Sequence, residues 1–256
     1  MSDKRSIEAA FAKANVPLVI TDRSLNRRLI RGGGQIVQMA IVRNRQGNEI
    51  ISMNIPDGEA IDVRALGADP EHQQVVVMVH EPARKIVQER FNFRTLKMER
   101  ETIRVPEGKR RFLVGMDECH LFIAQMRDDA GATSVKQAHK DLRPKEVPAP
   151  KQAKKLKIKR TGEWFLVPAT SEEIKEIEEH IKLYGSRKNV GIGGNSRGRG
   201  RPHVVTESVI IRSPNGQTEF VLGRILHPDH KVVKLKEWHR VIMNTENRSV
   251  GSQWVD

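Results

Sequence analysis

Three histidines in the last quarter of the chain could share one metal ion. His227 and His230 flank Pro228-Asp229, a dipeptide typical of a tight turn, and His203 opens the apolar run that comes before them. Neutral imidazole nitrogens are common zinc ligands, and three of them leave the fourth position of a tetrahedral zinc ion open for water. The sequence therefore predicts a zinc site at His203, His227 and His230, which would suit a metal-dependent hydrolase or nuclease.

Strand register decides whether the third histidine reaches the other two. If Ser213 and Gly216 bracket the turn between the first two strands, antiparallel pairing places His203 opposite Leu226. A shift of one residue would place it opposite His227 instead. The zinc hypothesis therefore requires an irregularity of one residue in this pair of strands.

A second group of candidate residues is the arginines that alternate with glycine in residues 197–202. Arg199-Gly200-Arg201-Pro202 resembles the core of the AT-hook, a short motif that binds the DNA minor groove. The resemblance implies that glycine lets the backbone lie in the groove, about 6 Å wide, while the arginines reach its floor. Arg-Gly segments also bind RNA through charge and flexibility. We therefore expect Arg197, Arg199 and Arg201 to contact nucleic acid.

A basic strand face beside a tryptophan is the third candidate. Residues i, i+2 and i+4 of a strand share one face, so Lys234, Lys236, Trp238 and Arg240 would lie together. An indole ring can stack on a base while neighbouring cations contact phosphates. The alternative is that Trp238 packs beneath the stems of the lysines as part of the fold.

Other patterns are less specific. The glycines of residues 191–200 follow a predicted helix and precede a strand, whereas phosphate-binding loops run from a strand into a helix. Cys119 and His120 are adjacent, so in a strand their side chains would point to opposite faces, and a catalytic cysteine is not expected. The single cysteine excludes an intramolecular disulfide, and a cytoplasmic protein is the default.

The elements that must position these residues favour an α+β fold of two small domains. We expect a hairpin-rich N-terminal domain over residues 1–142, a Pro/Lys-rich linker over 143–155, a C-terminal domain over 156–244 and a polar tail over 245–256. In the C-terminal domain we expect one strand-like run over 156–168, a helix from about Ser171 to Tyr184, and a Gly/Arg-rich loop over 186–202. Three strands then form a β-meander over residues 203–244.

Charge is the strongest global feature of the 256 residues. The formal net charge is +13, and residues 151–256 carry 20 basic and 12 acidic residues. No run of 18 apolar residues exists, so no membrane-spanning helix is expected. A positive field of this size attracts polyanions, so our leading hypothesis is a nucleic-acid-binding protein. The alternatives are the metal-dependent hydrolase and an interaction module for an acidic protein partner.

Overall fold

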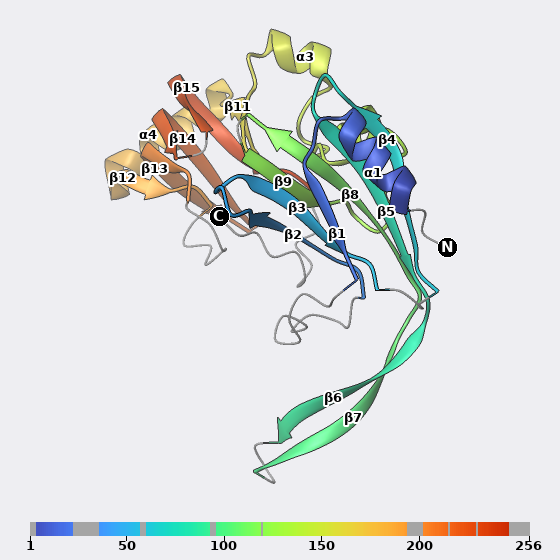
Figure 1. The fold of residues 1–256 in the computed structure, drawn as a ribbon. Helices are drawn as coiled ribbons and strands as arrows, with labels where there is room; N and C mark the ends of the chain where they lie inside the picture. The colour runs from blue at the N-terminus through green and yellow to red at the C-terminus, as the bar shows by residue number, and fades with distance from the viewer. Residues whose placement is uncertain are drawn as a thin grey trace. The chain divides into compact units, whose positions relative to one another are not determined.

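The computed structural model describes residues 4–22, 36–56, 60–92, 96–118, 120–193, 202–214, 216–228 and 230–245. Contacts divide them into two compact units, the first formed by residues up to 116 together with 121–141, and the second by 117–120 together with 142–245. Strands predominate and four helices accompany them, which confirms the α+β fold class (Figure 1). Within these ranges, no helix has both the length and the apolar character needed to cross a membrane.

The first unit contains three separate sheets. A three-stranded sheet has the order β1-β3-β2, a four-stranded sheet has the order β4-β5-β8-β9, and, in the part of the chain that the structure describes, β6 pairs with β7 alone. Two helices accompany them. The elements are α1 (Lys4–Lys13), β1 (Leu18–Thr21), β2 (Gln38–Arg43), β3 (Glu49–Asn54), β4 (Asp62–Asp69), β5 (Gln74–Glu81), β6 (Arg84–Asn92), β7 (Lys97–Val105), β8 (Gly108–Asp117), β9 (His120–Gln125) and α2 (Val135–Asp141).

The core of the first unit lies between helix α1 and two of these sheets. Ile7 and Phe11, one turn apart on α1, are buried against Ile51 and Met53 of β3 and against the valines of β5. Residues at i and i+4 share one helix face, so the apolar stripe of the sequence becomes the buried stripe of the helix. Every residue of the run 75–79 is buried, which explains its continuous apolar character.

The second unit is built on one six-stranded sheet. Its order is β10-β11-β15-β14-β13-β12, and every neighbouring pair is antiparallel. Helices α3 and α4 complete the unit. The elements are α3 (Pro150–Lys155), β10 (Lys159–Thr161), β11 (Trp164–Pro168), α4 (Ser171–Tyr184), β12 (Arg187–Gly191), β13 (Val204–Ser213), β14 (Gly216–His227) and β15 (His230–Met243).

The six-stranded sheet is strongly curled, with a core on each face. One face buries Trp164, Leu166, Val205 and Val221 together. The ring of Trp164 also lies against Gly193, just beyond β12, and a Cβ on this glycine would come within 2.7 Å of the ring. Strands near opposite edges of the sheet therefore approach each other around this core. The other face packs on α4 through a cluster that contains Ile177, Val209 and Phe220.

Two predictions about local structure were wrong. The run 156–168 is a hairpin, because Gly162 has φ +52 and turns the chain between β10 and β11. The segment 186–202 is not a continuous loop, because β12 (Arg187–Gly191) pairs with β13 at the edge of the sheet. The lysine and arginine in β12 do not alternate with apolar residues, so the sequence carries no strand signal there.

The segment predicted as a linker contributes to the second unit. Val147 is buried with Phe165 and Val167, the guanidinium of Arg143 lies 5.5 Å from the ring centre of Phe165, and residues 150–155 form α3. The proposed division at 143–155 stays a prediction.

Candidate metal centre

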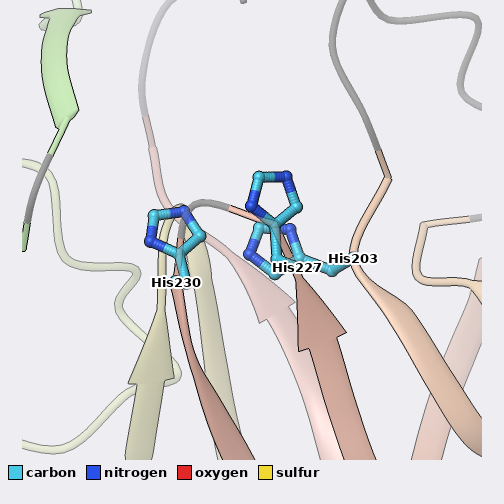
Figure 2. Close-up of side chains that lie close together, drawn as sticks. All are labelled: His203, His227 and His230. Carbon is cyan, nitrogen blue, oxygen red and sulfur yellow. The ribbon is translucent and has the colours of Figure 1, made fainter.

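Three neighbouring strands bring the predicted histidines to one end of the six-stranded sheet. His203 lies immediately before β13, His227 is the last residue of β14, and His230 is the first residue of β15. His227 and His230 are directly paired across the turn. Figure 2 shows the three imidazole rings side by side, so the set expected from the sequence is assembled in the structure.

The rings are close enough for their nitrogens to share one ion. One ligand nitrogen from each histidine lies within 4.8 Å of the other two. The ring centre of His203 lies 4.3 Å from that of His227 and 5.1 Å from that of His230. The ring centres of His227 and His230 are 4.8 Å apart. Zinc–nitrogen bonds are about 2.0–2.1 Å, so two nitrogens on one ion lie about 4 Å apart at most, and any pair farther apart has to move closer to bind it. The geometry can hold a metal ion.

His203 has the character of a metal ligand rather than of a surface histidine. It is only 5% exposed, and its Nε2 atom is buried without a hydrogen-bond partner. Burial, and then the charges of His227 and His230, lower the pKa of His203 to about 3. The imidazole is therefore neutral at physiological pH, which is the form that binds metal. A buried nitrogen with no partner is costly unless something else satisfies it.

A glycine in the β10–β11 turn closes one side of the cluster. A Cβ on Gly162 would lie 3.1 Å from Cε1 of His203 and 3.1 Å from Nε2 of His230. Arg160 donates from Nε to the carbonyl oxygen of Gly162 at 2.9 Å, which holds the turn in place. A side chain at this position, where φ is +52, would press on both rings, and sequence reasoning missed this glycine because it treated residues 156–168 as one strand.

A β-bulge supplies the shift of one residue that the zinc hypothesis requires. From Ser213 to Glu207 the strands pair as the turn dictates, but beyond Thr206 the register changes, so that Val204 pairs with Leu226. Gly223, at φ +92, provides the extra residue in β14. The hydroxyl of Thr206 accepts from the amide of Arg224 at 3.0 Å and donates to its carbonyl at 3.2 Å. The shift places His203 level with His227.

Gly223→Ala is expected to weaken both the fold and metal binding. A Cβ there would lie 2.9 Å from Cβ of Thr206, in a backbone region that costs side-chain-bearing residues about 1–3 kcal/mol. The free energy of unfolding by urea and the zinc affinity should both fall. Gly47→Ala is the matched control, because Gly47 has a similar φ of +84 with nothing within 4 Å of its Cβ position. Unchanged zinc affinity in Gly223→Ala would show that the bulge does not set the site.

A carboxylate fixes the backbone next to the third histidine of the cluster. Oε2 of Glu118 accepts a hydrogen bond of 2.8 Å from the amide of Lys231, the residue after His230. This contact limits how far the start of β15 can move.

Residues of the predicted basic strand face have different surroundings. Lys234 and Lys236 are exposed on β15. Trp238 is half-buried against the cluster of α4, and Arg240 donates to Glu173 of α4 at 3.0 Å. The first two side chains are therefore available at the surface, whereas the other two contribute to packing.

Several residues named from the sequence lie outside the described residues. They are Cys119, Asp229 and the arginines of the Gly/Arg-rich segment, Arg197, Arg199 and Arg201.

No protein-family model, curated protein or solved structure matches the chain.

Acid should destabilise the metal-free protein through His203. Its pKa is 6.5 in an unfolded chain and about 3 when folded, so between these values the unfolded state binds more protons and stability falls as the pH falls. We expect a loss of about 3 kcal/mol between pH 7 and pH 4 from this group. The measurement is urea unfolding in chelator at both pH values. His203→Leu should lose correspondingly less stability over this range, and an equal loss in both proteins would contradict the assignment.

Proposed function

We propose that the protein binds one zinc ion through His203, His227 and His230. The observation that carries the proposal is the buried, unpartnered Nε2 of His203, which lies in a cluster whose ligand nitrogens are within 4.8 Å of one another. Histidine nitrogens suit zinc, copper, iron and nickel, whereas magnesium and calcium prefer oxygen ligands. Zinc is our choice because three histidines around a tetrahedral ion are a common arrangement of a hydrolytic centre.

We further propose that this zinc activates water for hydrolysis. Among the described residues, the candidate ligand group has three members, which leaves the fourth position of a tetrahedral ion for water. Zinc lowers the pKa of bound water to about 7, so that a hydroxide nucleophile is available at neutral pH. A structural zinc site would instead have four protein ligands and no open position.

Metal analysis and a hydrolysis assay test this proposal together. We expect about one zinc per chain, and hydrolysis of p-nitrophenyl acetate or bis(p-nitrophenyl) phosphate that a chelator removes and added zinc restores. His239→Ala is a suitable control because His239 is buried on β15 but does not belong to the cluster. Absence of bound metal would contradict the zinc site, and zinc binding without zinc-dependent hydrolysis would contradict the catalytic role.

Nucleic-acid binding by the second unit is a second candidate function. It is favoured by the exposed positions of Lys234 and Lys236 and by the net charge of +13. The three arginines of residues 197–201 would extend this contact to phosphates. Replacing them with alanine should reduce the slope of log affinity against log salt by about two to three.

We propose a cytoplasmic location for either function, because the chain has a single cysteine.

A further inference from the structure

Among the described residues, strands β6 and β7 of the first unit form a ribbon with no other strand beside it. Nine residues of β6 pair with nine of β7, from Arg84 with Val105 to Asn92 with Lys97, and within the described ranges neither strand pairs with another sheet. Figure 1 shows this twisted ribbon continuing beyond the ends of β5 and β8. An isolated two-stranded ribbon is marginally stable in water, so a long one needs a further contact to stabilise it.

One face of the ribbon combines exposed cations with exposed apolar side chains. By register, Lys85 lies opposite Arg104 and Val87 opposite Thr102, and Arg100 lies two residues further along the same face. These side chains are exposed, and Val87 is 66% exposed. Met98, two residues beyond Arg100 on this face, is 58% exposed. Exposed apolar side chains mark an interaction site when they form a patch rimmed by polar residues.

The charge of the ribbon indicates the kind of partner. Residues 84–105 carry seven basic and three acidic residues, a net +4. Three of the basic residues, Lys85, Arg100 and Arg104, share the face just described. A surface that contacted a second copy of this basic chain would bring like charges together, whereas a polyanion would neutralise them.

We infer that the β6–β7 ribbon is a binding site for duplex DNA, with the ribbon lying in the major groove. The major groove is about 12 Å wide and admits a two-stranded ribbon. Nine extended residues span about 30 Å, the length of roughly nine base pairs. Lys85, Arg100 and Arg104 contact phosphates on the groove walls, and Val87 and Met98 contact the base edges, where thymine offers a methyl group. This site is independent of the zinc centre.

Charge removal on the full-length protein tests the inference. The variant Lys85→Gln/Arg100→Gln/Arg104→Gln should bind a 30-base-pair DNA duplex with a slope of log affinity against log salt reduced by about two to three, since each lost phosphate contact removes about 0.9. The matched control, Lys13→Gln/Arg45→Gln/Lys136→Gln, removes the same charge from exposed positions elsewhere in the first unit and should keep the slope. Circular dichroism and urea unfolding of both variants check that they fold.

Two further measurements make the result decisive. Chelator-treated wild type should bind the duplex as the untreated protein does, so failure of the zinc proposal leaves this one intact. Sedimentation of Val87→Ser/Met98→Ser tests the competing occupant, a second copy of the chain. Equal salt slopes in the two charge variants would overturn the inference, as would a wild-type dimer that Val87→Ser/Met98→Ser dissociates.

Discussion

Replacing His203 with alanine is expected to lower the zinc affinity by at least about 100-fold. Loss of a hydrogen-bond partner behind a zinc ligand already costs 10–100-fold, and loss of the ligand itself removes one of three bonds from the ion. His203 is the most buried member of the cluster, with 5% of its surface exposed, so no other described histidine can take its place without moving a strand. Competition with a chromophoric zinc chelator measures the affinity directly.

Zinc should also stabilise the wild type and not the variant. A ligand at 100 times its dissociation constant adds about 2.7 kcal/mol to the free energy of unfolding. His239→Ala is the control, because His239 is buried at 3% exposure and burial lowers its pKa, yet it is not part of the cluster. If His203→Ala bound zinc as tightly as the wild type, the cluster would be a set of stacked rings at a strand end and not a metal site.

The sequence was sufficient to select the three histidines but not to bring them together. The turn at Ser213–Gly216 predicts a register that leaves His203 one residue away from His227, and this register holds as far as Glu207. A glycine within a strand is typical of a bulge, so Gly223 was the available signal. Its effect on register depends on the contact with Thr206, which joins two strands and cannot be derived from local propensity.

The basic strand face illustrates the opposite case. Period-two alternation correctly groups Trp238 and Arg240 on one side of β15, because both contact α4. The pattern carries no information about what covers that side. Helix α4 was predicted from about Ser171 to Tyr184, and in the structure Thr170 and Glu173 form a capping box at its start. Its docking onto the sheet follows from tertiary packing, so the sequence left the role of Trp238 open.

A buried carboxylate holds the start and the end of β12 in the second unit. Oε1 of Glu219 accepts from Arg187 at 2.8 Å and from the hydroxyl of Ser208 at 2.7 Å, and Oε2 accepts from the amide of Gly193 at 2.7 Å. Glu219 is 8% exposed. These contacts attach the edge strand, whose sequence has no strand pattern, to β13 and β14.

Glu219→Ala is therefore expected to reduce the free energy of unfolding by about 3 kcal/mol, because it removes the acceptor of a hydroxyl and of an amide and the carboxylate partner of the Arg187 guanidinium. Glu207→Ala is the matched control on the neighbouring strand. Glu207 is bonded to Ser186 and pairs with the exposed Lys188, so its loss should cost about 1 kcal/mol or less. Urea unfolding of both variants at pH 7 gives the comparison. Equal losses would mean that the buried carboxylate contributes no more than a surface ion pair, and that β12 is held by its backbone pairing with β13 alone.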